Sequence, residues 1–403
     1  MLDIWPTLPI VVDDHHSRRR QQPRMEPVDG VIAALEHRNR VCQISLGCLP
    51  SSLFPIFTGM MQESFLGLTS LHLDATVKSP MLHPDSFLGG SAPRLRSLTL
   101  HRIPFPELPT LLLSTKDLAE LRLCDIPHSG YISPRAMVTC LSSLTRLEIL
   151  ELRFVSRQSS LNRSSRHLSS STCIDLPALT QFSFEGANEY IDFVAQINAP
   201  LLRHIRITFF DRPLFDISQL TQFIGRLEIF KVPHRAVVDF ESVYTDAQFS
   251  LVEDPAHGST VTFPVSFATL EWQLPLMTAL FGSSSSPFRL SSSEGLDIWA
   301  TDAAGADLYA DTDIQWLEML QPFTAVKELR LDVDAHAALS LGSTLQGLAG
   351  ERAAEVLPAL QDIFIDEDCL TGAAREAMRP FITARQLSGH PVTVHRRELR
   401  YDD

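Results

Sequence analysis

The sequence has few cysteines, no excess of basic residues and no long apolar run. Its six cysteines form no C-x-x-C pair and no zinc-ligand spacing, which predicts reduced thiols in an intracellular protein. The net charge of −14 leaves no sequence-wide basic surface for nucleic acid. No stretch reaches the roughly 18 apolar residues of a membrane span, and the apolar start Ile4–Val12 lacks the basic segment of a secretory signal. We therefore expect a cytoplasmic or nuclear protein that binds neither nucleic acid nor membrane.

Enzyme motifs are also missing, because the sequence has no G-x-x-x-x-G-K-[ST] loop, no G-x-G-x-x-G and no G-x-S-x-G. We interpret three clusters of acidic residues and histidines as solvated surface: Asp13–His16, Asp307 with Asp311 and Asp313, and Asp332 with Asp334 and His336. The last cluster follows a predicted strand, where a metal or acid/base site could form. We predict no catalytic residue, no metal and no cofactor. A metal-dependent enzyme acting near His15 or Asp334 is the alternative.

A repeated leucine pattern is the main positive signal in a chain that is 44% hydrophobic and 20% charged, the mixture of a folded globular protein. Leu-x-x-Leu-x-Leu occurs four times with its last leucine at Leu73, Leu100, Leu123 and Leu152, at intervals of 27, 23 and 29 residues. A fifth match, ending at Leu113, falls out of register. These intervals lie within or near the period of leucine-rich repeats.

Weaker copies of the pattern extend the repeat in both directions. With any aliphatic residue or Phe allowed, further matches end at Leu46, Phe184, Ile207, Leu331 and Ile365. An aliphatic residue followed by proline comes just after three of the predicted strands, at Leu49-Pro50, Ile103-Pro104 and Ile126-Pro127. Proline has no N–H to donate and so ends a strand. Between Ile207 and Val326 the register is open, with plausible strands at Val237–Phe240, Phe267–Trp272 and Leu296–Ile298.

Helices are predicted between the strands. Ser133 can cap a helix with Pro134 at its first position, and Met137, Cys140, Leu141 and Leu144 share one face. Further helical segments are predicted at Ser52–Phe65, Leu108–Thr115 and Asp192–Ile197, and after Asp313.

Strand, turn and helix together form a unit that must stack on its neighbours to bury its apolar face. The predicted fold is α/β: an irregular leucine-rich-repeat solenoid with a parallel β-sheet on the concave face and helices on the convex face. It is irregular because the turn position that regular repeats fill with Asn or Cys holds Thr76, Ile103, Ile126 and Val155. We expect a partly disordered leader at 1–27 and a repeat domain at 28–403 with inserted Ser-rich loops at about 156–173 and 282–293.

Alternation along the strands predicts which side chains are open to a partner. The pattern leucines point inward, so the residues between them point out of the sheet. This outer surface is either merely solvated or a platform for another protein, which is how solenoids commonly use their concave side. We take the second interpretation and expect a monomer that binds a protein substrate. The predicted partner-binding residues are His72, Thr99, Arg122, Glu151, Ser183, Arg206 and Arg330.

Several blocks of sequence carry a resemblance to a known family. They are Leu2–Ile10, Ile32–Val41, Asp85–Leu95, Ile126–Pro134, Ala136–Leu144, Gln315–Lys327 and Val356–Leu360. Together they resemble the large fungal (basidiomycete) family of F-box proteins with irregular leucine-rich repeats, along almost the whole chain.

The resemblance implies a role in ubiquitination. In such families the F-box docks on the adaptor subunit of a cullin-RING ubiquitin ligase, and the repeats hold the substrate. We expect no F-box within this sequence, because the similarity begins where the repeat domain would begin; the F-box is then either lost in this copy or missing from a truncated gene product. We therefore expect the adaptor to bind only if an F-box is supplied in the full-length product. A stand-alone interaction scaffold without a ligase role is the alternative.

Overall fold

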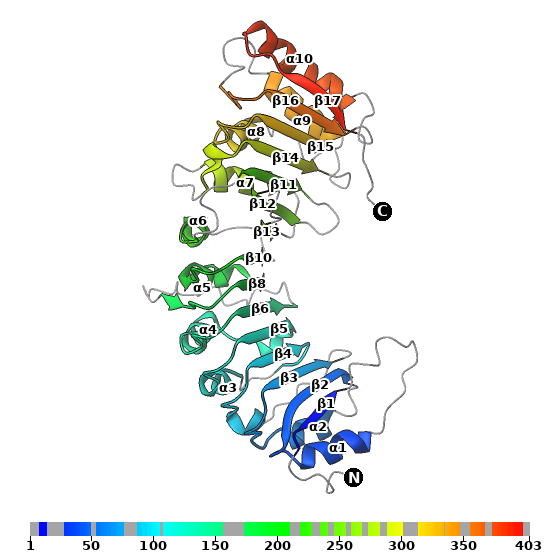
Figure 1. Ribbon diagram of the computed structural model, residues 1–403, viewed down its shortest axis with the longest axis vertical. Helices are drawn as coiled ribbons and strands as arrows, with labels where there is room; N and C mark the ends of the chain where they lie inside the picture. Colours follow the sequence, from blue (N-terminus) through cyan, green and yellow to red (C-terminus); the bar gives the residue numbers. More distant parts are fainter. Residues whose placement is uncertain are drawn as a thin grey trace. The chain divides into compact units, whose positions relative to one another are not determined.

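The computed structural model describes sixteen segments of the chain: residues 8–13, 28–49, 54–75, 87–104, 108–155, 173–209, 218–227, 234–240, 246–254, 259–267, 273–282, 288–300, 313–333, 335–346, 355–366 and 373–397. The chain forms two compact units, Met1–Leu202 and Arg203–Asp403. Both are mixed α/β structures in which parallel strands and helices alternate along the chain (Figure 1).

The first unit is built on a parallel sheet. Its strands are β1 (Ile10–Asp13), β2 (Val41–Leu49), β3 (Ser70–Ala75), β4 (Ser97–His101), β5 (Glu120–Ile126), β6 (Ile149–Phe154) and β8 (Gln181–Gly186). They lie side by side in this order, and every neighbouring pair is parallel. Two short strands, β7 (Ile174–Asp175) and β9 (Ile197–Asn198), form a separate parallel pair. All four leucine matches that share the register thus predicted a strand correctly.

The leucines of the repeat form continuous buried rows across this sheet. Leu71, Leu98, Leu121, Leu150 and Phe182 are successive partners in the register, and each is at most 1% exposed. A side chain that alternates with period two lies on one face of the sheet, so identical spacing in each strand aligns the leucines. The register predicted from the sequence is therefore confirmed in this unit.

Backbone hydrogen bonds repeat in the same rhythm just before each strand. The amide of Thr69 donates to Cys42, that of Arg96 to Thr69, that of Ala119 to Arg96, and so on through Glu148 and Thr180. Side-chain bonds between neighbouring strand segments span 27, 23, 29 and 32 residues along the chain. The backbone bonds do not depend on which side chains occupy these positions, so they can join successive segments of different sequence.

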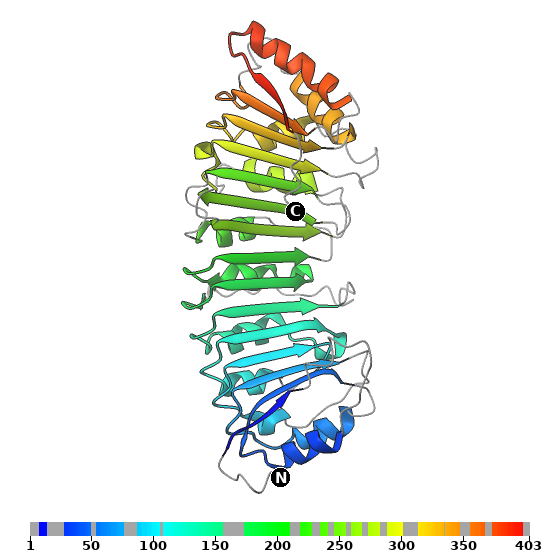
Figure 2. The same cartoon turned by 45° about the vertical axis from the view of Figure 1, so that its right-hand side comes forward.

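The helices of the first unit are α1 (Val28–Glu36), α2 (Phe54–Met60), α3 (Leu108–Ser114), α4 (Pro134–Leu141) and α5 (Ile191–Gln196), with single 3-10 turns at Phe87–Gly90, His128–Gly130 and Asn188–Tyr190. Of these, α3, α4 and α5 lie behind the strands in Figure 2, whereas α1 lies at the β1 end of the sheet. The cap predicted for α4 is present, since the Ser133 hydroxyl accepts a hydrogen bond from the Ala136 amide at 3.3 Å. Met137, Cys140 and Leu141 are buried, as their spacing predicts.

The second unit contains the strands β10 (His204–Phe209), β11 (Arg235–Phe240), β12 (Asp246–Asp254), β13 (Ser259–Phe267), β14 (Gly295–Ala300), β15 (Glu328–Val333), β16 (Asp362–Asp366) and β17 (Thr393–Arg397). Their order in the sheet is β10-β13-β12-β11-β14-β15-β16-β17. The pairs from β14 to β17 are parallel, as are β10 with β13 and β11 with β14.

The expectation of a wholly parallel sheet is wrong at β12, which runs antiparallel to both β11 and β13. The connections between these strands, 241–245 and 255–258, are too short for the crossover of a dozen or more residues that a parallel pair needs. We call β11, β12 and β13 the meander. The chain reverses before and after β12, so β13 runs in the same direction as β11, and the meander pairs in parallel with β10 through β13 and with β14 through β11. The strand predicted at Phe267–Trp272 shares only Phe267 with β13, which ends at that residue, and 268–272 lie outside the described residues.

The helices of the second unit are α6 (Ser218–Gly225), α7 (Gln273–Gly282), α8 (Asp313–Leu320), α9 (Ala335–Gln346) and α10 (Ala373–Leu387), with a 3-10 turn at Leu290–Ser292. The predicted helix after Asp313 is α8, and its Trp316 is fully buried. Arg385 of α10 is also fully buried, and its guanidinium donates to the carbonyls of Val356, Leu357, Pro358 and Leu360. Burial lowers the pKa of Arg385.

The described residues test only part of the predicted N-terminal leader and of the two predicted Ser-rich loops. Ile10–Asp13 of the leader is a strand of the first sheet, with Ile10 and Val12 buried, so this part belongs to the fold. Most of the predicted insertion at 156–173 lies outside the described residues, as does 283–287 of the second loop. Within the part of the chain that the structure describes, no helix is long and apolar enough to cross a membrane.

Candidate functional site

Five of the seven predicted partner-binding residues form one line across the first sheet. His72, Thr99, Arg122, Glu151 and Ser183 are successive partners in the register of β3, β4, β5, β6 and β8. All five are partly exposed, while the residues on either side of them along each strand, leucines on β3 to β6 and phenylalanines on β8, are buried. We call this line the central row. Neighbouring strands lie about 4.8 Å apart, so the row extends for roughly 19 Å.

Ion pairs connect the central row to the residues beside it. The Arg122 guanidinium bonds Glu120 Oε1 at 2.5 Å and Glu151 Oε2 at 2.9 Å. Glu151 also pairs with Arg153 at 3.0 Å, and Ser97 Oγ donates to Glu120 Oε2 at 2.9 Å. Charges and hydroxyls of three adjacent strands are thereby held in fixed positions on the exposed face.

These contacts keep Glu120 and Arg122 ionised. Partial burial by itself raises the pKa of Glu120, but hydrogen bonds from Arg122 and Ser97 outweigh it and hold that pKa below its usual value. Burial likewise opposes the charge of Arg122, and its bonds to Glu120 and Glu151 outweigh this and raise its pKa. Neither group is therefore poised to exchange a proton near neutral pH.

A second cluster lies where β3 and β4 end. His101 bonds Asp74 Oδ1 through Nδ1 at 2.8 Å and Asp125 Oδ2 through Nε2 at 2.7 Å, and Arg102 also bonds Asp74 at 2.7 Å. Asp74 is buried, which raises its pKa, but the bonds from Arg102 and His101 outweigh burial and lower it. Arg102 and Asp125 have positive φ angles of 60° and 51°, a conformation that non-glycine residues rarely adopt. Carrying the strand alternation one step further predicts Asp74 and His101, but not the irregularity of β5 between Leu123 and Ile126 that supplies Asp125.

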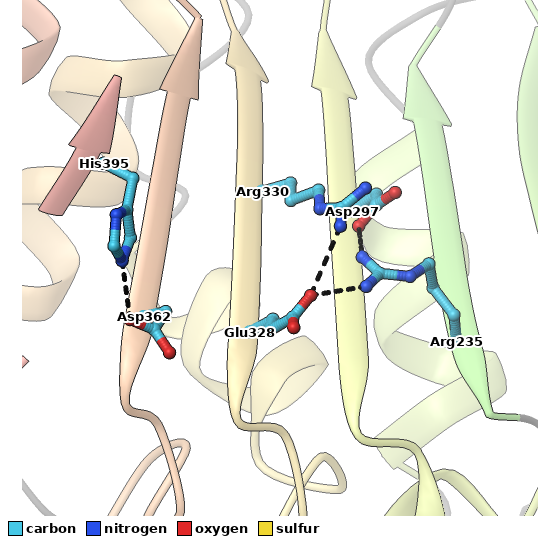
Figure 3. Close-up of polar contacts among 6 residues, drawn as sticks. All are labelled: Arg235, Asp297, Glu328, Arg330, Asp362 and His395. Atoms are coloured by element: carbon cyan, nitrogen blue, oxygen red, sulfur yellow. Dashed lines mark hydrogen bonds and ion pairs between the residues drawn. The ribbon is translucent and has the colours of Figure 1, made fainter. Parts of the chain in front are cut away.

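The exposed face of the second unit carries its own ion-pair network (Figure 3). Arg235 of β11 bonds Asp297 of β14 at 2.5 Å and Glu328 of β15 at 2.6 Å, and Arg330 bonds Glu328 at 3.3 Å. Arg235 crosses the intervening strand at Gly295, where a Cβ atom would lie 2.7 Å from its Cζ. Glycine at this position therefore lets the guanidinium reach Glu328.

Aromatic contacts continue this network toward β17. The Arg330 guanidinium lies 5.4 Å from the ring centre of Phe364, and that ring stacks on His395 with centroids 4.7 Å apart. His395 Nε2 bonds Asp362 at 2.7 Å (Figure 3). Sequence reasoning identified Arg330 but missed its neighbours. The alternation of Ile363 and Ile365 places Phe364 on this face, and that of Leu296 and Ile298 does the same for Asp297.

The remaining predicted residue, Arg206, is exposed on β10. The strands β13, β12, β11 and β14 separate it from Arg330 on β15, so the fold does not bring these two residues together.

Most residues of the three candidate metal clusters lie outside the described segments. Asp13 is exposed on β1, while 14–16, Asp307, Asp311 and Asp334 lie outside the described residues. No group of three or more His, Cys, Asp or Glu side chains able to hold a metal ion occurs within the described segments.

The cysteines that can be described are free thiols: Cys42, Cys124, Cys140 and Cys173. Burial raises the pKa of Cys124 and that of Cys140 to about 11, so these two thiols stay protonated and weakly nucleophilic at neutral pH.

Comparisons with known proteins add no relative. No family model matches the chain, and no curated protein matches it.

Proposed function

We propose that the chain is a protein-binding leucine-rich-repeat module that holds its partner on the exposed face of its sheet. The observation that carries the proposal is the central row: five polar residues from five strands in one line, opposite a face of buried leucines. Repeat proteins commonly use their concave sheet face in this way.

The energetics of the central row favour a role in recognition. Its ion pairs are partly exposed, and such pairs contribute roughly 0 to 1 kcal/mol each to folding. The buried leucine rows supply the stability, so polar residues of the central row can vary with the partner. Because Arg122 is fixed between Glu120 and Glu151, a partner meets oriented groups and loses less side-chain entropy on binding.

The repeat assignment draws on the leucine spacing, on the buried rows and on the stacking of backbone bonds before each strand. The resemblance to fungal F-box proteins extends the proposal: the module recruits a substrate to a cullin-RING ubiquitin ligase, provided that the full-length product supplies an F-box. The second candidate is a scaffold without a ligase role, which the same exposed face would serve.

The experiment is affinity capture from cells with the proteasome blocked, comparing the wild type with Arg122→Ala/Glu151→Ala. The matched control is Arg146→Ala, which removes an exposed ion pair with Asp117 at 2.8 Å outside the central row. We expect partners that the wild type and the control both retain and the double variant loses. Partners retained equally by all three proteins would refute the use of this face.

The ligase role is tested separately with the full-length product. Co-purification with the ligase adaptor, and accumulation of the captured partner when the proteasome is blocked, would support it. A partner that binds without the adaptor would leave the scaffold as the function.

A further inference from the structure

The strand β17 forms one border of the sheet in the second unit (Figure 1). It pairs with β16 on one side, and no strand of the described segments pairs with its other side. A border strand presents a row of backbone N–H and C=O groups that can pair with another chain. The sheet can therefore be extended at β17.

The hydrogen bonds of β17 show which of its backbone groups point outward. The Thr393 amide donates to the Gln361 carbonyl, just before β16, at 2.8 Å. Backbone groups of successive residues point to opposite sides of a strand, so those of Thr393 and His395 face β16. The N–H and C=O groups of Val394 and Arg396 face the other side. These two residues supply the backbone groups to which a further strand would bond.

A buried aliphatic row of the inner face ends at the same place. Leu296, Leu329, Ile363 and Val394 are successive register partners on β14, β15, β16 and β17. The first three are fully buried, whereas Val394 is 36% exposed. An aliphatic residue beside Val394, on a strand added to β17, would continue the row and remove this apolar surface from water.

The next row of the inner face ends at a basic residue. Ile298, Leu331 and Ile365 are buried partners in the register, and Arg396 takes the following position on β17. The whole strand reads Thr-Val-His-Arg-Arg and contains no carboxylate. Opposite charges on directly paired residues of neighbouring strands stabilise the pairing, and like charges destabilise it. An acidic residue is therefore favoured beside Arg396, and a basic one is disfavoured.

We propose that β17 binds an extended segment of a partner protein as an additional strand, with an aliphatic residue beside Val394 and Asp or Glu beside Arg396. These positions are two residues apart, so the segment reads aliphatic-x-acidic if it runs parallel to β17 and acidic-x-aliphatic if it runs antiparallel. Backbone bonds supply affinity for any strand, and the two side chains select among strands. The site lies at the border of the sheet and goes beyond the proposed function, which uses the exposed face.

The test is an NMR titration of the full chain with its valine amides labelled with ¹⁵N. One probe is the peptide acetyl-Thr-Asp-Thr-Val-Thr-Asp-Thr-amide, which presents the pattern in both directions, and the other has Lys in place of both Asp residues. Val394→Ile assigns the Val394 signal by removing it. Val238 is the internal control, because its strand β11 is paired on both sides.

We expect the acidic peptide to shift the Val394 signal with saturation and to leave the Val238 signal unmoved. The lysine peptide should bind about fivefold more weakly. Arg396→Glu should reverse this preference and Arg396→Gln should remove it, while an unchanged Val238 signal shows that each variant is folded.

The proposal is overturned if Val394 shows no saturable shift, or if the preference for the acidic peptide survives Arg396→Glu. It is also overturned if the Val394 signal shifts when the protein concentration alone is raised, because a second copy of the chain would then occupy the border. None of these results bears on the central row, which is tested by capture with Arg122→Ala/Glu151→Ala.

Discussion

Leu121 and Arg122 are adjacent on β5 but have opposite roles, so replacing each by alanine tests the assignment of the two faces. Leu121 is fully buried between Leu98 and Leu150. Leu121→Ala removes three carbon atoms from a packed row and leaves a cavity, for which we expect a loss of about 2 to 5 kcal/mol in the free energy of unfolding. Arg122→Ala removes two partly exposed ion pairs, and we expect it to cost at most about 1 kcal/mol.

Urea denaturation followed by circular dichroism measures both losses. Hydrogen exchange of peptides covering β5 then shows whether the loss arises in the first unit, where Leu121 lies. The reasoning fails if the two variants are equally destabilised, or if Arg122→Ala is the worse of the two, because either result would reverse the inner and outer faces. A loss below about 1 kcal/mol for Leu121→Ala would show that the leucine row is not a close-packed core.

Three further predictions concern polar contacts and one glycine. Arg385→Met should lower the free energy of unfolding by about 2 to 4 kcal/mol, because four buried carbonyls between 356 and 360 lose their hydrogen-bond donor. Thermal melting measures this loss, and Arg379→Met, at an exposed position on the same helix, is the control. The lowered pKa of Asp74 means that its carboxylate stabilises the fold above about pH 4 and that this stability is lost as the pH falls through the folded-state value. Asp74→Asn should therefore be less stable than the wild type at pH 7, and the gap should narrow in denaturation at pH 3; a constant gap would contradict it. Gly295→Ala should cost about 1 to 3 kcal/mol by displacing Arg235, and combining it with Arg235→Ala should recover part of the loss in the same assay.

The sequence by itself determined the strands that carry the leucine pattern and the two faces of each. Period-two alternation is local information, and the leucine spacing sets the register, so Leu121 inside and Arg122 outside follow without coordinates. The central row could be predicted for the same reason. The Ser133 cap of α4 is likewise encoded within a few residues.

Tertiary structure alone decided which distant residues meet. The antiparallel β12, the approach of Asp125 to His101, and the reach of Arg235 past Gly295 to Glu328 depend on how strands far apart in sequence are ordered. The position of Trp299 between Asp239 and Asp332 depends on the same order, because β14 pairs with β11 and not with β13, the strand that precedes it in the sequence. Such contacts arise from pairing between segments, and no local periodicity records which segments pair.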